Sequence, residues 1–276
     1  MIGMPSSFAA VAAFPALGVS VWVLAALVLA AFVAGWVDSV VGGGGLIQLP
    51  ALVIALPAEA STPEILGTNK LSSVAGTLVA TLTYLRKIRV PVAMVLPLVV
   101  AAFAGSAAGS SVARFIPKEL LTPIVLVAVV AVGAYTYFTP TMGRVHEERH
   151  TGWSRTWRSA LIGGVIGFYD GVLGPGTGSF FVIAIVAFLG FGFLQGTVAA
   201  KLANLTTNIA SILVFGLHGE LLWIIGGCMA LANLAGGFLG ARMAMRHGNE
   251  FIRTVFLVVI SILAVRLAWE TATQWL

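Results

Sequence analysis

The stretch 35–50, "GWVDSVVGGGGLIQLP", places an aspartate and four consecutive glycines inside an otherwise apolar run. Glycine destabilises a helix interior by about 1 kcal/mol relative to alanine. An ionised carboxylate at membrane depth costs several kcal/mol unless a partner or water stabilises it. Glycine, however, lets the backbone turn sharply and approach a ligand closely. The stretch therefore predicts an interrupted helix at a functional position.

The composition is that of a polytopic membrane protein. Of the 276 residues, 59% are hydrophobic and only 9% are charged, with a mean hydropathy of +1.03. Soluble domains carry about 25% charged residues, so this chain could not cover a soluble surface. We predict an all-α fold, in which the segments shorter than a full span are re-entrant or otherwise buried. The apolar segments are 18–38, 46–57, 65–86, 91–113, 119–139, 159–172, 178–191, 196–217, 221–244 and 252–270.

Landmarks of the first half recur in the second half at nearly constant spacing. The glycine cluster "GGGGLIQ" is matched by "GPGTGSF", each beginning four residues after an aspartate. The matched residues, 131 or 132 positions apart, are Asp38 and Asp170, Lys70 and Lys201, Gly105 and Gly236, and Gly109 and Gly240. The chain is therefore predicted to be an internal duplication. We expect about five segments in each repeat, with repeats at 18–140 and 159–273 and a cytoplasmic linker at 141–158.

The basic residues predict that the two repeats are inverted, because Lys and Arg collect in cytoplasmic loops. Arg86, Lys87 and Arg89 lie in one loop of the first half, whereas the matching "LHGEL" loop of the second half has no Lys or Arg. Equivalent loops are thus expected on opposite faces, with both termini outside a bacterial cytoplasmic (inner) membrane. This topology accounts for the net charge of +5 without nucleic acid as a partner.

Inverted repeats with interrupted helices are typical of secondary transporters, whose substrate site lies near the membrane midplane. After each glycine cluster a short helix begins, and its free N–H groups and positive dipole end can bind an anion. Lysines, amides and hydroxyls nearby are further candidate donors. The candidate substrate-binding residues are Gly43, Gly44, Gly45, Gln48, Thr68, Asn69, Lys70, Ser73, Gly176, Thr177, Gly178, Ser179, Lys201, Asn204 and Asn208.

Each of these features also has a structural interpretation. Asp38 and Asp170 could each carry a coupling proton, or each could form a fixed ion pair with the lysine of its own repeat. We favour the structural role, because an ionised aspartate in an anion site would repel the substrate. The amides and hydroxyls could instead make interhelical hydrogen bonds. Close helix packing is the interpretation that we prefer for Gly105, Gly109, Gly236 and Gly240.

The stretch His146–His150, "HEERH", fits a zinc metalloprotease motif, which requires a helix that presents both histidines on one face. Here it lies in the most charged linker of the chain, and the other histidines, His218 and His247, are in distant loops. We therefore predict no metal site, no cofactor and no enzymatic activity.

The patterns "GxxDSxxGGGGL", "GTNK" and "GFYDGxLGPGTGSF", the last followed by "KxxN", resemble the sulfite exporter TauE/SafE family, also called the toluene sulfonate uptake permease family. The resemblance covers about residues 20–270. It implies a secondary transporter of sulfur-containing anions such as sulfite, sulfoacetate and related organosulfonates. The expected partners are that anion, membrane lipid and a coupling ion, either proton or sodium. The alternatives are a channel-like anion pore and a transporter of a different small organic anion.

Overall fold

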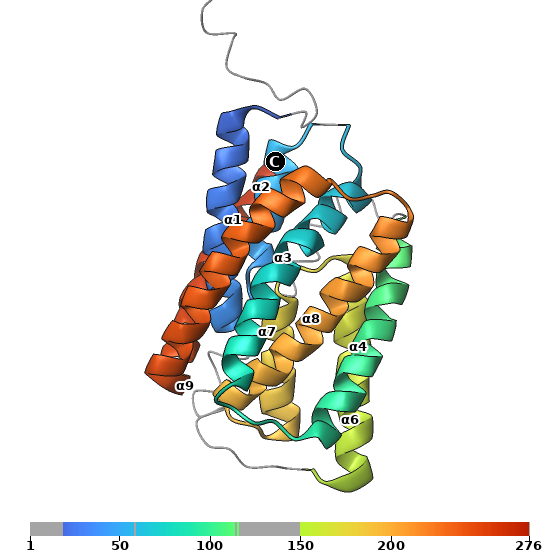
Figure 1. Cartoon of the computed structure of the whole chain (residues 1–276), viewed down its shortest axis with the longest axis vertical. Helices are drawn as coiled ribbons and strands as arrows, with labels where there is room; N and C mark the ends of the chain where they lie inside the picture. The colour runs from blue at the N-terminus through green and yellow to red at the C-terminus, as the bar shows by residue number, and fades with distance from the viewer. Residues whose placement is uncertain (1–18, 58, 114, 116–149, 276) are drawn as a thin grey trace, which may run out of the picture.

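The helices follow the apolar segments of the sequence. The computed structural model describes residues 19–57, 59–113, 115 and 150–275. The elements are α1 (Val21–Val41), α2 (Gly45–Ala55), α3 (Thr62–Leu85), α4 (Val92–Ala113), α6 (Gly152–Val172), α7 (Thr177–Ala184), the π-helical turn η2 (Ile185–Leu189), α8 (Phe193–Leu217) and α9 (Trp223–Trp275) (Figure 1). No strand occurs in these ranges, which confirms the all-α fold class.

Four helices are long and apolar enough to span a membrane: Val21–Val41, Val92–Ala113, Phe193–Leu217 and Trp223–Gly248. They confirm that the chain is an integral membrane protein. The apolar helices Gly45–Ala55 and Thr177–Leu189 are shorter, as the lengths of segments 46–57 and 178–191 predict. The predicted segment 119–139 lies outside the described residues, as does all of "HEERH" except His150.

The predicted start of one helix is wrong. Helix α6 begins at Gly152 rather than at residue 159, and its 21 residues reach about 31 Å at 1.5 Å per residue. The arginines Arg155 and Arg158 lower the hydropathy of its first two turns, but they do not interrupt the helix. The helix is therefore long enough for a full span.

Helix α9 contains a chain reversal at Gly248, where φ is 74° and ψ is −161°. A glycine adopts this positive φ without the steric cost that a Cβ would bring. The first arm descends from the upper end of the molecule in Figure 1, and the C-terminus lies back at that end. The two arms correspond to the predicted segments 221–244 and 252–270.

Corresponding helices of the two halves begin at a constant offset. Helices α6, α8 and α9 begin 131 residues after α1, α3 and α4, and α7 begins 132 residues after α2. In Figure 1 the members of the pairs α1/α6, α3/α8 and α4/α9 run in opposite directions. Helices of the first half pack against helices of the second half: α1 lies on α9, α4 lies on α6, and α3 packs against α8. This arrangement supports the predicted inverted repeat, and both the inversion and its orientation in the membrane stay predictions.

Glycines allow the helices of the two halves to approach closely. A Cβ placed on Gly105 or Gly109 would lie 2.4 or 2.2 Å from carbonyl oxygens of α6. A Cβ on Gly236 or Gly240 would lie 2.0 Å from an oxygen of α1. Real Cβ atoms essentially never come within 3.0 Å of such neighbours. The prediction that these four glycines serve helix packing is confirmed.

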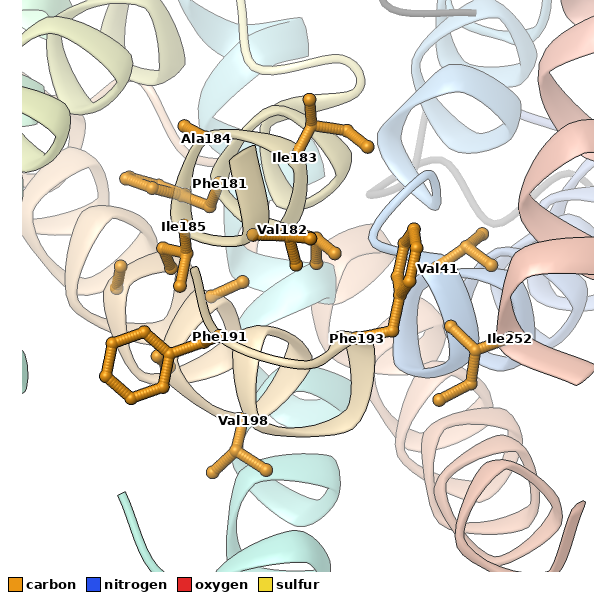
Figure 2. Close-up of a cluster of buried hydrophobic side chains, with 14 of the residues drawn as sticks. Val41, Phe181, Val182, Ile183, Ala184, Ile185, Phe191, Phe193, Val198 and Ile252 are labelled. Atoms are coloured by element: carbon orange, nitrogen blue, oxygen red, sulfur yellow. The ribbon is translucent and has the colours of Figure 1, made fainter. Parts of the chain in front are cut away.

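An apolar core surrounds α7 and η2 (Figure 2). Phe181 and Ile185 are fully buried there, and Phe193 at the start of α8 is 1% exposed. Val41 and Ile252 bring the end of α1 and the second arm of α9 into the same cluster. Lipid tails are as apolar as these side chains, so close packing rather than escape from water stabilises the cluster. The core therefore fixes the second short helix against α8 and the end of α1.

Candidate functional site

The two glycine clusters interrupt helices as predicted, and the two breaks touch each other. Gly42 ends α1 with a φ of 81°, and Gly174 follows α6 with a φ of 89°. A Cβ on Gly42 would lie 2.3 Å from the carbonyl carbon of Gly178 in the opposite break. Only glycine satisfies both the backbone angle and this contact. The contact brings the start of α7 against the end of α1.

Hydrogen bonds between the breaks hold this contact. The Ser179 N–H donates to the Gly42 carbonyl at 3.2 Å, and the Ser179 hydroxyl donates to the Val41 carbonyl at 2.8 Å. The Thr177 hydroxyl donates to the Gly174 carbonyl at 2.7 Å and closes the second break. Both hydroxyl protons are donated within the protein in this conformation. Their donation to an anion stays a prediction.

Two buried ion pairs join the halves. The Lys201 Nζ lies 2.6 Å from the Asp38 Oδ2, and the Lys70 Nζ lies 2.6 Å from the Asp170 Oδ2. The prediction that each aspartate would pair with the lysine of its own repeat is therefore wrong, because the pairs are exchanged. Helices α3 and α8 pack against each other. Each lysine side chain extends from that contact to the aspartate of the opposite half.

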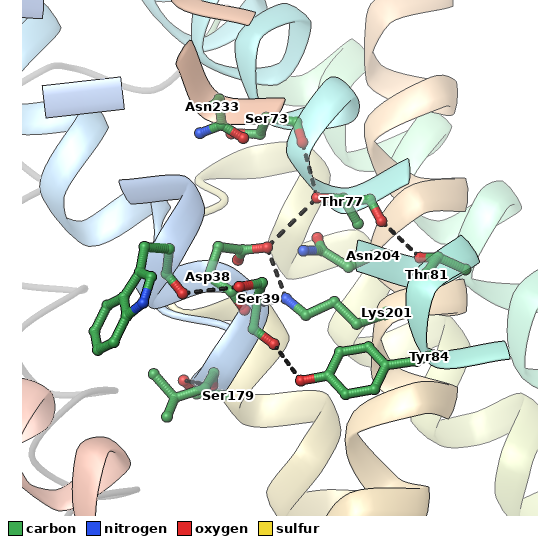
Figure 3. Close-up of polar contacts among 12 residues, drawn as sticks. Asp38, Ser39, Ser73, Thr77, Thr81, Tyr84, Ser179, Lys201, Asn204 and Asn233 are labelled. Atoms are coloured by element: carbon green, nitrogen blue, oxygen red, sulfur yellow. Dashed lines mark hydrogen bonds and ion pairs between the residues drawn. The ribbon is translucent and has the colours of Figure 1, made fainter. Parts of the chain in front are cut away.

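Further polar contacts hold Asp38 and the last turn of α1 (Figure 3). The Thr77 hydroxyl of α3 donates to the Asp38 carboxylate at 3.4 Å, and the Lys201 ammonium also contacts the Asp38 backbone carbonyl. The Tyr84 hydroxyl donates to the Ser39 carbonyl at 2.9 Å. The end of α1 is thus attached to both α3 and α8.

A small cavity lies between the breaks and the ion pairs. Its lining residues from the first half are Asp38, Gly42, Gly45, Asn69, Lys70 and Ser73. Its lining residues from the second half are Asp170, Gly174, Gly178, Asn204 and Asn208. About 20 Å³ of it admits the centre of a water molecule, which is room for about one water. This space is smaller than a sulfonate, with its sulfur and three oxygens.

The cavity brings together part of the predicted site. The predicted residues that line it are Gly45, Asn69, Lys70, Ser73, Gly178, Asn204 and Asn208, together with Asp38 and Asp170. The predicted residues that do not line it are Gly43, Gly44, Gln48, Thr68, Gly176, Thr177, Ser179 and Lys201. The prediction omitted Gly42 and Gly174. Their shared position, four residues after each aspartate, was the signal that could have identified them.

Several of the residues outside the cavity have structural contacts. A Cβ on Gly44 would lie 2.6 Å from the Asp38 Cβ, so this glycine allows α2 to approach α1. The Thr68 hydroxyl accepts a hydrogen bond from the Leu222 N–H at 3.2 Å, just before α9. The Gly44 contact lies within the first half, whereas the Thr68 hydrogen bond joins the two halves.

Gln48 positions one wall of the cavity. It is fully buried, and its Nε2 donates to the Asn69 side-chain oxygen at 2.9 Å. Its Oε1 accepts from the Ser72 hydroxyl at 3.2 Å and from the Asn233 amide at 3.1 Å. Gln48 therefore connects α2 with α3 and α9. Its contact with a substrate stays a prediction.

Unpaired hydrogen-bond donors surround the cavity. Asn208 is 2% exposed, and its Nδ2 has no hydrogen-bond partner among the described residues. The backbone N–H groups of Gly45 and Gly178, in the first turns of α2 and α7, have no backbone acceptor in the same part of the chain. Buried donors in folded proteins nearly always find an acceptor. The arrangement therefore suits a ligand rich in acceptors, such as an oxyanion.

Within the described ranges, no group of three or more His, Cys, Asp or Glu residues could hold a metal ion.

Comparison with known proteins agrees with the membrane fold. The family model described as "Sulfite exporter TauE/SafE" matches residues 27–267. "Probable membrane transporter protein ORF9" of Sinorhizobium sp is 38% identical over 244 residues, which are 88% of this chain and 92% of that protein. "Probable membrane transporter protein YfcA" of Escherichia coli K12 is 32% identical over 256 residues, 93% of each chain. A "Probable membrane transporter protein" of Haemophilus influenzae is 35% identical over 247 residues, 90% and 95% of the two chains. No solved structure matches the chain significantly.

Proposed function

The chain belongs to the sulfite exporter TauE/SafE family of membrane transporters, and we propose that it carries a sulfur-containing anion by alternating access. Sulfite, sulfoacetate and related organosulfonates are the candidate substrates. The family and its relatives support transport, whereas the chemistry of the cavity supports an anion as the transported species. The site is the cavity between the two helix breaks.

One observation carries the choice of an anion. The buried Asn208 amide nitrogen has no acceptor among the described residues, and it lines the same cavity as the Lys70 ammonium. The oxygens of a sulfonate accept hydrogen bonds from both groups, and the bond from the ammonium is charge-assisted. The unpaired N–H groups of Gly45 and Gly178 would add two backbone donors to the same oxyanion.

The charge balance of the site supports a coupling ion. Two lysines and two aspartates neutralise each other in the exchanged ion pairs. An anion that enters this balanced site adds a net negative charge at membrane depth, where uncompensated charge is costly. A proton on Asp38 or Asp170, or a sodium ion beside them, removes that charge. We therefore propose that the anion and a cation cross together.

The transport cycle requires the cavity to widen. In our proposal the Lys70 ammonium turns from Asp170 toward the anion, and the two breaks separate on one side of the membrane at a time. The opposite directions of the matched helices support such a cycle, because inverted repeats give two states of similar energy. In this proposal the small cavity is the occluded intermediate between them.

The first test is binding of sulfite, sulfoacetate, taurine, sulfate and a carboxylate analogue to the purified protein, measured by calorimetry. Asn208→Ala should weaken the preferred sulfonate by about tenfold, because a hydrogen bond to a charged group is lost. Its Tm should stay near that of the unmodified protein, because the amide nitrogen has no protein partner to lose. Ser211→Ala is the control, since this buried hydroxyl lies outside the cavity and should lower Tm slightly while it preserves affinity. Unchanged sulfonate affinity in Asn208→Ala would contradict the proposed site.

The second test distinguishes a transporter from a channel-like pore. In proteoliposomes, uptake by a transporter saturates and is accelerated when the same anion is present on the opposite side. A pore would show neither property.

The inverted topology has its own test. After Cys228→Ser removes the single native cysteine, Ile88→Cys and Gly219→Cys should label from opposite sides of the membrane. Labelling of both from one side would exclude the inversion.

A further inference from the structure

A second hollow lies where the C-terminal end of α3 meets the first arm of α9. Its volume is about 500 Å³, well above that of the central cavity. Four of the residues that line it are basic: Arg86, Lys87, Arg242 and Arg246. Figure 1 places this region at the lower end of the molecule, where α3 ends beside the first arm of α9. The hollow is therefore separate from the proposed transport site.

The described residues do not balance the positive charge of the hollow. None of the four basic side chains forms an ion pair with an acidic residue in the described part of the chain. The Arg242 guanidinium stacks on the Phe238 ring at 4.0 Å from its centroid, and both residues line the hollow. Four cations in one concave surface repel one another unless an anion lies between them. The hollow thus suits a ligand that carries phosphate.

The neighbouring surface indicates a lipid rather than a soluble phosphate. Leu78 and Leu82 are 45% and 51% exposed on α3, and they lie two turns and one turn, respectively, before Arg86 on the same helix face. Leu239 is 46% exposed on α9 and lies three residues before Arg242. On both helices, outward-facing leucines therefore lead along the membrane-facing surface to a basic residue of the hollow. A phospholipid has this order of apolar chain and charged headgroup.

We propose that the hollow binds the phosphate-bearing headgroup of an anionic phospholipid, with the acyl chains along the exposed leucines of α3 and α9. Basic pockets between membrane helices bind such headgroups on the cytoplasmic side. The leaflet is the one that faces the Arg86–Arg89 loop, which the positive-inside rule assigns to the cytoplasm. The bound lipid joins the end of α3 to α9 and stabilises the contact between the two halves.

Native mass spectrometry of the detergent-purified full chain tests this binding. Phosphatidylglycerol should bind the unmodified protein at least about tenfold more tightly than phosphatidylcholine, because each basic residue adds to the attraction. The double variant Arg242→Gln/Arg246→Gln should lose that preference, and Arg242→Lys/Arg246→Lys should retain it. Arg89→Gln is the control. Arg89 is exposed in the loop that carries Arg86 and Lys87, but it does not line the hollow.

Thermal unfolding separates a lipid site from a soluble anion site. Phosphatidylglycerol should raise the Tm of the unmodified protein, whereas inorganic phosphate at the same concentration should not. A phosphate shift as large as the lipid shift, and lost in Arg242→Gln/Arg246→Gln, would overturn the lipid assignment. Equal binding of the two lipids, or unchanged phosphatidylglycerol binding in that double variant, would overturn the site itself.

Discussion

The Asp38–Lys201 pair and the Asp170–Lys70 pair occupy matched positions in the two halves, but their surroundings differ. The carboxylate of Asp38 also accepts a hydrogen bond from Thr77 at 3.4 Å, and Lys201 contacts the Asp38 backbone carbonyl as well. The Asp170 Oδ2 has the Lys70 ammonium, at 2.6 Å, as its single partner among the described residues. The duplicated site has thus kept its charges, while the hydrogen bonds that support them have diverged.

The polar networks behind the pairs have diverged in the same way. On the first side the buried amides of Gln48 and Asn233 bond to each other at 3.1 Å. On the second side a hydroxyl cluster joins Ser106 and Ser110 to Ser211 at 2.9 Å each. The Asp38 carboxylate is thus contacted from both α3 and α8, whereas the Asp170 Oδ2 has only Lys70 of α3 as a partner among the described residues. We expect the Lys70–Asp170 pair to open first in the cycle.

The largest expected difference is in stability. Asp170→Asn should lower the free energy of unfolding by about 3–5 kcal/mol, because it leaves the Lys70 ammonium, 2% exposed, buried without a counter-charge. Asp38→Asn should cost less, because the Asp38 side chain is 12% exposed and Lys201 keeps the backbone carbonyl as an acceptor. Thermal and denaturant unfolding in one detergent measures both variants. Equal losses of unfolding free energy in the two variants would contradict the proposed difference between the pairs.

A double-mutant cycle tests the exchange of partners itself. Lys70→Ala and Asp170→Ala should show a coupling energy of about 1–3 kcal/mol, because these side chains are in contact. Lys70→Ala and Asp38→Ala, from one half, should couple by less than about 0.5 kcal/mol. Stronger coupling within a half than between the halves would mean that the functional protein uses the other pairing.

The loss of anion affinity should also differ between the two lysines, and this difference should be smaller than the differences in stability. Lys70→Ala is expected to weaken sulfonate binding by about tenfold, and Lys201→Ala by less, because Lys201 has two fixed acceptors on Asp38. Arginine at either position should weaken binding less than alanine does, since the charge is retained. Calorimetric titration of purified variants measures the order. A greater effect at Lys201 would identify the Asp38 pair as the one that opens.

The smallest expected effects come from the supporting networks. Asn233→Ala should destabilise the protein by about 1–2 kcal/mol, because it removes hydrogen bonds to the Gln48 side chain and the Ala31 carbonyl. Ser211→Ala should cost about 0.5 kcal/mol, because Ser106 and Ser110 retain backbone acceptors on Thr207 and Gly171. Parallel unfolding measurements give the order. A larger loss for Ser211→Ala would show that the hydroxyl cluster is the stronger support.

Much of the fold could be predicted from residue type and spacing. The aspartate and glycine clusters indicated both helix breaks, and the apolar segment 65–86 indicated α3, which begins three residues earlier behind a capping box of Ser61 and Glu64. The start of α6 could not be found, because Arg155 and Arg158 mask an apolar helix in a hydropathy profile. The reversal at Gly248 was expected only as a gap between two segments.

The central site was predictable in its residue types but not in its pairing. Helical spacing places Lys70 and Lys201 at matched heights on their helices, and it carries no information about which half each side chain faces. That choice depends on how α3 and α8 pack, a contact between segments more than a hundred residues apart. For the same reason, the contact of Gly42 with Gly178 had no local signal.

The exchanged ion pairs also affect how the protein is made. Asp38 is synthesised 163 residues before Lys201, so the first half enters the membrane while its charged groups still lack their final partners. An unpaired charge at membrane depth is costly, which keeps the early helices from settling into their final packing. Insertion of the second half supplies both missing counter-charges, and the nascent chain matures only when its two halves are present together.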